Sequence, residues 1–289
     1  MRAFRLLACD LSCDLPWLRW AAIASLMAAA WPSWGQPLPP ATESGNCSLE
    51  GTVPATVAAV DDDFELLLDD GRRVALAGLD FPPRERVDLR AAVRDRLTSW
   101  LAGRDVFLGV FAASLDRWGR TPSRLYASDP AGGESAPLAS VAEALLSAGV
   151  VRFRPDPTTA ACATFYLTAE AAARDSRVGL WSMPEFRPID VSSPDAAKDL
   201  QRRRGMIIAI GDIRSVGESR RAFYLNFGDK WRDSFTVVIP RRNLAMFGRI
   251  EPRSLVGRRA RVRGLIETGS RIEIVTPAEI EFVDSGVPR

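Results

Sequence analysis

The residues of this chain that could do chemistry are carboxylates and arginines, because its 289 residues include no histidine. That absence excludes Ser–His catalytic triads, HExxH zinc sites and Cys–His zinc sites. Any acid–base step must therefore use a carboxylate, a lysine, a tyrosine or a metal-bound water. The candidates are concentrated in Asp61–Asp63, Leu79–Pro83 and Asp116–Arg120. Carboxylate oxygens suit a hard cation, and guanidinium groups suit a phosphate.

Taken in order, these segments resemble the active-site frame of the staphylococcal-nuclease-like (thermonuclease) family. The family pattern runs roughly V-x-D-G-D-T, then R-L-x-x-x-D-x-P-E, then D-[KR]-[YW]-G-R. This chain supplies DDDF from Asp61, ALAGLDFPP from Ala75 and DRWGR from Asp116. The resemblance continues to a GLW motif that begins at Gly179, and it covers Gly51–Ser182. It implies a small β-barrel with appended helices.

The resemblance also implies a phosphodiesterase site. In that family a calcium ion is held by two aspartates and a backbone carbonyl, two arginines neutralise the phosphate, and a glutamate acts on the attacking water. Carried over by position, Asp63 and Asp80 are the metal aspartates, and Phe81 supplies the carbonyl. Arg120, the last residue of DRWGR, is one of the phosphate arginines. Phe64 stands where the family has a threonine beside the metal.

Two catalytic positions depart from the family pattern. Ala75 stands where the second arginine belongs, and Pro83 stands where the glutamate belongs. Loss of one charge-stabilising donor costs about 10²–10³ in rate, and loss of a general base costs about 10²–10⁴. Glu85 is a candidate substitute base, and Arg72 or Arg73 is a candidate substitute arginine. The acidic turn also has an interpretation as a solvated turn without metal, so any calcium site is expected to be weak.

Turn residues and hydrophobic periodicity predict the elements that position these residues. The predicted strands of the first half are Gly51–Val60, Glu65–Leu68, Arg73–Leu79, Asp105–Phe111 and Arg124–Tyr126. The predicted helices are Leu89–Leu101, Leu138–Ala148 and Ala160–Ser176. The expected fold class is mainly β with α, an OB-fold nuclease-like barrel plus helices, followed by a second, smaller OB-like β-barrel.

The second barrel is predicted from three strands, a helix and two further strands. These are Met206–Ile213, Ala222–Phe227, Ser234–Ile239, the helix Arg242–Phe247, Arg259–Ile266 and Arg271–Val275. Its net charge is positive, whereas residues 46–199 are net negative, so it is either a polyanion-binding surface or a solvated basic surface. Candidate nucleic-acid contacts are Tyr224, Lys230, Arg232, Arg259, Arg261 and Arg263. The last three alternate along one strand and should share a face.

An alternative interpretation of the aromatic residues is structural. Alternation favours placing Phe223, Leu225 and Phe227 in the barrel core, which would turn Tyr224 outward.

The N-terminus resembles an export signal, with arginines before the apolar run Trp20–Trp31. Residues 1–35 are predicted to be a cleaved signal peptide, with an uncleaved anchor as the alternative, and residues 36–46 a flexible leader. The expected location is therefore periplasmic or secreted. Such a location favours a disulfide between Cys47 and Cys162, the alternative being two free thiols.

The predicted organisation is a nuclease-like domain (47–183), a linker (184–199) and an OB-like basic domain (200–285). The favoured hypothesis is an exported thermonuclease-like protein that binds single-stranded nucleic acid or another polyanion, with impaired phosphodiester cleavage. One alternative is an active calcium-dependent phosphodiesterase that uses Glu85 as its base. A second alternative is an envelope interaction module without a nucleic-acid role.

Overall fold

The computed structural model describes residues 47–112, 114–129, 136–193, 195–228, 234–248, 251–267 and 270–283. All of them belong to one compact unit, Pro37–Arg289. The predicted signal peptide and leader lie outside the described residues, as do Lys230 and Arg232. Within the described ranges, no helix is both long enough and apolar enough to cross a membrane.

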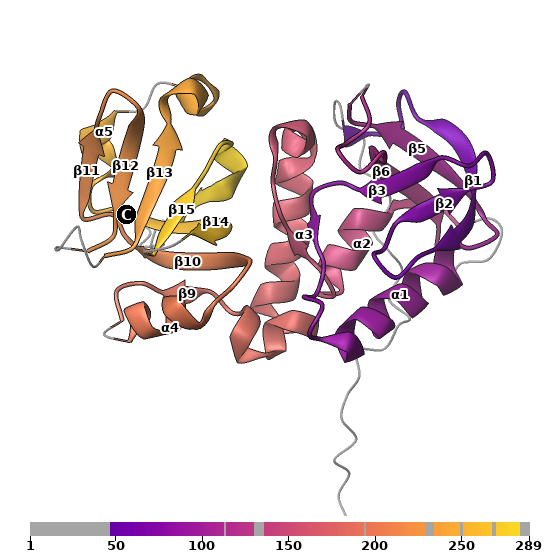
Figure 1. Cartoon of the computed structure of the whole chain (residues 1–289), viewed down its shortest axis with the longest axis horizontal. Coiled ribbons are helices and arrows are strands. Elements are labelled where there is room, and N and C mark those ends of the chain that lie inside the picture. The colour runs from indigo at the N-terminus through magenta and orange to yellow at the C-terminus, as the bar shows by residue number, and fades with distance from the viewer. Residues whose placement is uncertain are drawn as a thin grey trace, which may run out of the picture. The chain divides into compact units, whose positions relative to one another are not determined.

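Five strands of the first half close into a barrel (Figure 1). They are β1 (Val53–Val60), β2 (Leu66–Leu68), β3 (Arg73–Leu76), β5 (Asp105–Val110) and β6 (Thr121–Ser128). Four of the pairings are antiparallel, and the parallel pairing of β3 with β6 closes the barrel. Alternate apolar side chains such as those of Val57, Leu66 and Val74 are fully buried in its core. The architecture is compatible with an OB-like fold, and the predicted mixture of a β-barrel with helices is confirmed.

Helices and short strands complete this half of the molecule. The helices are α1 (Val87–Leu101), α2 (Val141–Ser147) and α3 (Ala163–Asp175), and the short strands are β4 (Leu79–Asp80), β7 (Leu138–Ser140) and β8 (Arg152–Phe153). Helix α2 begins later than predicted because Leu138 extends the sheet beside β6. The Ser140 hydroxyl then accepts a hydrogen bond from the Glu143 N–H, which makes Ser140 the helix N-cap.

A disulfide joins Cys47 to Cys162, which confirms the predicted bridge. Cys47 precedes β1, and Cys162 ends the 3₁₀-helix η2 (Pro157–Cys162) just before α3. Both half-cystines are buried, and 115 residues separate them in sequence. The bridge therefore ties the start of the barrel to the helical segment that follows it.

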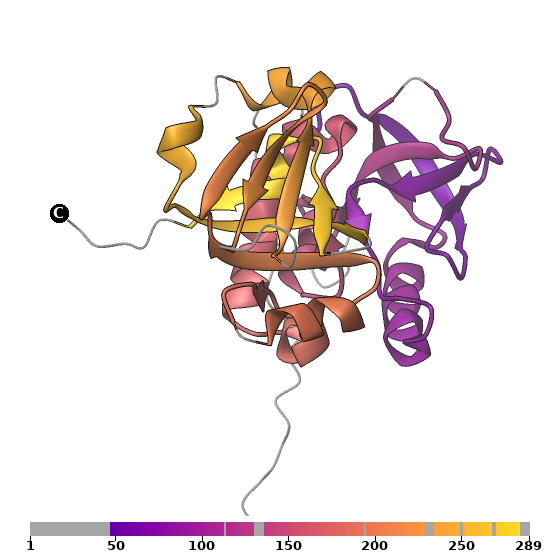
Figure 2. The same ribbon diagram turned by 60° about the vertical axis from the view of Figure 1, so that its left-hand side comes forward.

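Eight strands of the second half form another sheet (Figure 2). They are β9 (Ile189–Asp190), β10 (Met206–Asp212), β11 (Ser215–Glu218), β12 (Ala222–Asn226), β13 (Thr236–Pro240), β14 (Arg259–Glu267), β15 (Arg271–Glu273) and β16 (Ile280–Phe282). The hydrogen-bonded order is β11-β12-β13-β15-β14-β10-β9, with β16 also paired to β14. Among the described strands this path does not close on itself, so a second closed barrel is not shown.

Helical turns flank this sheet. The predicted helix at Arg242–Phe247 is instead the 3₁₀-helix η5 (Arg241–Phe247), and α5 (Pro252–Leu255) follows it. The segment predicted to be a linker contains η4 (Pro184–Phe186), strand β9 and the start of α4 (Ala196–Arg202). Because β9 pairs in parallel with β10, this segment is part of the sheet.

The GLW motif lies where two chain segments approach closely. It forms the 3₁₀-helix η3 (Gly179–Ser182) against the end of α2. A Cβ added at Gly149 would lie 2.5 Å from the Val178 carbonyl oxygen, and one at Gly179 would lie 2.4 Å from the Gly149 carbonyl oxygen. Both glycines also have positive φ, so only glycine fits this contact. The contact buries Trp181, which packs with Ala173 of α3 and Ile208 of β10.

Candidate functional site

The acidic turn between β1 and β2 is held by its first aspartate. One carboxylate oxygen of Asp61 accepts hydrogen bonds from the N–H groups of Asp63 and Glu65, both at 2.9 Å. Phe64 closes the turn with φ of 64°, an uncommon conformation for a residue with a side chain. Its buried ring stacks on the ring of Phe81 with 4.2 Å between centroids. The turn is therefore ordered by its own hydrogen bonds and by this aromatic pair.

Asp63 faces two arginines. Both of its carboxylate oxygens accept hydrogen bonds from Arg84, at 2.9 and 3.0 Å, and Arg90 donates to one of them at 3.1 Å. Arg90 also donates to the backbone carbonyls of Asp62 and Pro82 and lies over the Phe64 ring. One arginine of α1 thus joins the acidic turn to the loop after β4, and the Asp63 carboxylate is neutralised within the chain.

Asp80 is engaged in the same way by a different arginine. Arg152, on the neighbouring strand β8, donates to one Asp80 oxygen at 2.7 and 3.2 Å. Both side chains are largely buried, and Arg152 also donates to the Met206 carbonyl at 2.9 Å. The structure therefore pairs each predicted metal aspartate with arginine. Within the described ranges, no group of three or more acidic, Cys or His side chains could hold a metal ion.

Arg120 is fixed by two carboxylates. Its Nε donates to Asp116 at 2.8 Å, and its Nη1 donates to Glu65 at 3.0 Å. The other Asp116 oxygen accepts the N–H groups of Trp118 and Arg120, so the DRWGR segment forms a closed turn. Burial raises the pKa of the Asp116 carboxyl, but these hydrogen bonds outweigh burial and hold that pKa below its usual range.

Glu65 is a candidate site residue that sequence reasoning missed. Its second carboxylate oxygen is ion-paired to Arg73, so Glu65 bridges Arg73 and Arg120 with a side chain only 10% exposed. The β2–β3 register could have indicated this arrangement. Because Leu66 pairs with Val74, the next residues along the two strands are Glu65 and Ala75. A glutamate with two arginines therefore lies beside the position where the family has its second arginine.

The two positions that depart from the family pattern, Ala75 and Pro83, carry no ionisable side chain. Ala75 is half-buried in β3, and Pro83 is exposed in the loop after β4. Glu85, the predicted substitute base, is also exposed, and it makes no hydrogen bond or ion pair within the described part of the chain. Arg72 pairs with Asp70 in the β2–β3 turn, and Arg73, the other candidate substitute, shares Glu65 with Arg120.

The predicted arginine face of β14 is largely covered. The Arg263 side chain is 1% exposed and forms ion pairs with Glu170 at 2.6 Å and Glu281 at 2.7 Å. Arg261 pairs with Glu281 at 3.4 Å. Burial of these side chains withdraws Arg263, and most of Arg261, from the predicted exposed surface.

Two other predicted contacts are also engaged, though nearer the surface. Arg259 pairs with Asp190 and Asp212, at 3.1 and 3.3 Å. Tyr224 is half-buried with its hydroxyl 3.4 Å from the Ser219 hydroxyl, and its neighbours Phe223 and Leu225 are buried as the alternation indicated.

No protein-family model matches the chain, and a search of curated proteins found no similar sequence. Support for a function therefore comes from geometry: Asp63 and Asp80 are each paired with arginine, and Glu65 bridges two arginines.

Proposed function

We propose that this chain is a thermonuclease-like protein that binds single-stranded nucleic acid or a related polyanion and cleaves phosphodiesters poorly. The observation that carries the proposal is the pairing of Asp63 and Asp80 with arginines. A calcium ion would have to displace guanidinium groups from both carboxylates, so calcium binding is weak. At the position of the family's glutamate, Pro83 has no group that accepts a proton.

Binding is supported by an exposed aromatic side chain in the DRWGR turn. Trp118 is 55% exposed, and its ring lies 3.9 Å from the Arg117 guanidinium carbon and 4.5 Å from that of Arg120. An exposed indole flanked by cations is the arrangement on which bases of a single strand stack while arginines contact the phosphates. Trp118 and Arg117 therefore make up the proposed base platform.

The proposal extends to fold and location. Membership of the thermonuclease family is supported by the closed five-stranded barrel and by the order of the three motifs along it. A second OB-like barrel is supported by the strand path, because only Ile213 and Arg214 separate β11, at one end of that path, from β10, the strand next to its other end. Export to the periplasm or medium is supported by the disulfide, which persists in oxidising compartments.

A second candidate function is efficient calcium-dependent phosphodiester cleavage, and the Glu65 bridge is what favours it. Glu65 together with Arg73 and Arg120 offers one carboxylate and two cations in a single cluster. In this version Glu65, rather than the exposed Glu85, would orient the water, and the two arginines would take the phosphate charge.

The test uses the purified full-length chain with fluorescent single-stranded DNA and RNA. We expect affinity to fall steeply as salt rises, to survive a chelator and to weaken about tenfold in Trp118→Ala, since stacking contributes about 1–3 kcal/mol per base. We expect little degradation with or without calcium. Asp62→Ala, next to Asp63 and 87% exposed, is the matched control for Asp63→Ala.

Each alternative predicts a different outcome. Rapid calcium-dependent degradation that is lost in Asp63→Ala but kept in Asp62→Ala contradicts the binding-only proposal. If that activity is also lost in Glu65→Gln and kept in Glu85→Gln, calcium-dependent cleavage with Glu65 as the base replaces the binding-only proposal. Absence of any salt-dependent affinity for either strand favours an interaction module without a nucleic-acid role.

A further inference from the structure

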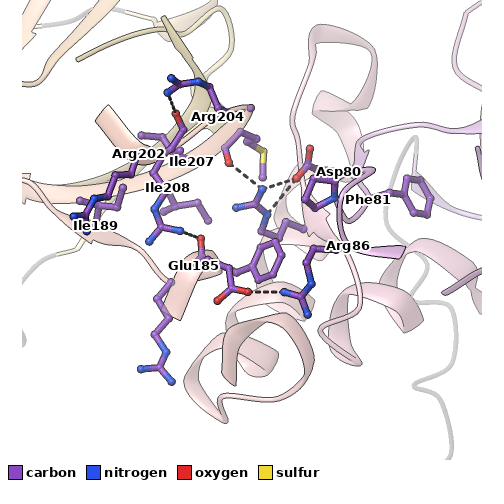
Figure 3. Close-up of a pocket in the computed structure, with 16 residues that line it drawn as sticks. Asp80, Phe81, Arg86, Glu185, Ile189, Arg202, Arg204, Ile207 and Ile208 are labelled. Atoms are coloured by element: carbon purple, nitrogen blue, oxygen red, sulfur yellow. Dashed lines mark hydrogen bonds and ion pairs between the residues drawn. The ribbon is translucent and has the colours of Figure 1, made fainter. Parts of the chain in front are cut away.

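A cleft lined by arginines lies beside Asp80 (Figure 3), and no residue of the Trp118 turn is among the described residues that line it. Its volume is about 290 Å³, close to the lower end of small-molecule sites. Side chains of Phe186, Ile189 and Ile207 form apolar parts of its wall. Its arginines are Arg86, Arg152, Arg187, Arg202, Arg203 and Arg204.

The positive charge of this cleft is only partly matched. Two carboxylates line it, and each already has an arginine partner. Asp80 pairs with Arg152 at 2.7 Å, and Glu185 pairs with Arg86 at 2.5 Å (Figure 3). The remaining four arginines have no carboxylate partner among the residues that the structure describes.

Backbone carbonyls hold three of these four arginines in place. Arg187 donates to the carbonyls of Trp181 and Ser182, and Arg203 donates to those of Pro184 and Glu185. Arg204 donates to the carbonyls of Gln201 and Arg203 at 2.9 and 2.8 Å. A carbonyl positions a guanidinium without neutralising it, so the donors are ordered and the charge remains.

Arg202 and Arg203 differ in how far their side chains are exposed to solvent. Arg202 is exposed, and its side chain has no partner in the described ranges. Arg203 is half-buried, and burial lowers its pKa although the nearby charges of Asp199 and Glu185 act in the opposite direction. An anion bound in the cleft would add negative charge beside these guanidinium groups.

We propose that this cleft binds a phosphate monoester, held by Arg187 and by the run Arg202–Arg204. A phosphate monoester carries close to two negative charges and three acceptor oxygens, which suits a cleft whose lining holds more arginines than carboxylates. The small volume favours one terminal phosphate and part of the group attached to it over a continuous strand. If the phosphate is the end of a nucleic-acid strand, the inference rests on the proposed polyanion binding. If the phosphate belongs to a free nucleotide, the inference does not depend on that proposal.

Two sets of calorimetric titrations distinguish a free nucleotide from the phosphorylated end of a strand as the source of the phosphate. The first uses inorganic phosphate, adenosine 5′-monophosphate and adenosine with the full-length chain. The second compares a short single-stranded DNA that carries a 5′-phosphate with the same strand ending in a hydroxyl. We expect adenosine 5′-monophosphate to bind and adenosine not to bind, and the 5′-phosphate to strengthen strand binding by about tenfold, because hydrogen bonds to charged groups contribute about 1.5–3 kcal/mol.

The double variant Arg202→Ala/Arg204→Ala tests the site, because both side chains are exposed and their loss should leave the fold intact. Arg104→Ala/Arg214→Ala removes the same charge from two exposed arginines outside the cleft. We expect the first pair to abolish the preference for a phosphate and the second to keep it. Equal loss in both pairs, or no phosphate preference in the unaltered chain, overturns the inference.

Failure of this inference and failure of the proposed function give different results. Salt-dependent strand binding with neither a 5′-phosphate preference nor binding of adenosine 5′-monophosphate rules out the phosphate site and leaves the proposed function. Binding of adenosine 5′-monophosphate, sensitive to Arg202→Ala/Arg204→Ala, without affinity for either strand removes the proposed function and identifies the cleft as a small-anion site.

Discussion

Glu279 shows how one buried carboxyl can make the stability of the molecule depend on pH. It lies in the 3₁₀-helix η6 (Pro277–Glu279), where one of its oxygens accepts the N–H groups of Val275 and Thr276, at 2.6 and 2.8 Å. Burial raises its pKa from 4.5 to about 7 even though those hydrogen bonds act in the opposite direction. The folded state therefore holds the proton more tightly than the unfolded chain does.

The sign of the pH effect follows from that difference. The contribution of Glu279 to stability is fully present below pH 4.5 and is lost as pH rises through about 7. A glutamine side chain at this position has no charge to bury, and its carbonyl can accept both N–H groups. We therefore expect Glu279→Gln to gain stability relative to the natural chain between pH 5 and pH 8, on the order of 1–3 kcal/mol.

Urea denaturation at the two pH values measures this gain. Glu273→Gln is the control, because Glu273 is partly exposed and pairs with Arg242 at the surface. A Glu279→Gln variant whose stability relative to the natural chain changes with pH no more than that of the control contradicts the prediction.

At the same scale, the sequence identified some site residues but not their partners. Asp63, Asp80 and Arg120 were found because short motifs fix their positions along the chain. Arg152 was not found as the partner of Asp80, since 72 residues separate the two and only the folded chain brings β4 beside β8. Glu65 was read as the start of a strand rather than as a bridge between arginines. An ion pair across 72 residues, such as that of Asp80 with Arg152, has no local signal, whereas the Glu65–Arg73 pair follows from how β2 and β3 pair.

Among the elements, the disulfide has the clearest expected effect. It closes a loop over a sequence separation of 115 residues, between the residues before β1 and the end of η2. Restricting the unfolded chain in this way typically contributes about 2–4 kcal/mol. We expect a reducing agent to lower the free energy of unfolding by that amount. Denaturation of the natural chain and of Cys47→Ser, each with and without reductant, is the measurement. A Cys47→Ser chain that responds to reductant, or a natural chain that does not, contradicts the assignment.

The accuracy of the predicted elements depended on their length and burial. Helix α1 was predicted within two residues because it carries several buried residues at helical spacing, and the eight-residue strand β1 was predicted equally well although only Val57 in it is buried. Strands β11, β16 and β9 were missed, since they have four, three and two residues and lie at or near the sheet edges. Such strands exist through pairing with neighbours, which local periodicity does not encode.

At the scale of the whole molecule, a buried ion cluster joins the two halves. Glu170 of α3 is 0% exposed and accepts hydrogen bonds from the Phe153 N–H at 2.7 Å and from Arg263 of β14 at 2.6 Å. Arg263 also donates to the Phe153 carbonyl at 3.1 Å and to Glu281. The alternation of arginines along β14 was correct, but sequence alone could not show that α3, 93 residues earlier, covers the Arg263 side chain.

Removing one member of this cluster should be costly. Arg263→Met leaves the buried Glu170 with Arg174, at 3.4 Å, as its remaining cation partner among the described residues. Breaking a buried ion pair typically costs about 3–5 kcal/mol, and here the buried Glu170 charge loses its nearer partner while keeping the longer ion pair with Arg174. Thermal or urea unfolding checks this value.

Two further variants separate charge from packing. Arg261→Met removes a cation from the same strand at a more exposed position and should cost much less. Glu170→Gln/Arg263→Met should recover part of the loss, since the stranded charge is gone. A double variant less stable than Arg263→Met alone contradicts the explanation.

The Glu170–Arg263 pair has a consequence for how this protein can be divided and inherited. A gene fragment that stopped at Met183 would keep the whole barrel and α3, yet it would lack the arginine that compensates Glu170 and the Ile208 side chain that covers Trp181. Exchange of the C-terminal sheet with that of another protein would meet the same obstacle unless positions 170 and 263 changed together. The two halves should therefore be transplanted, truncated and diversified as a single module.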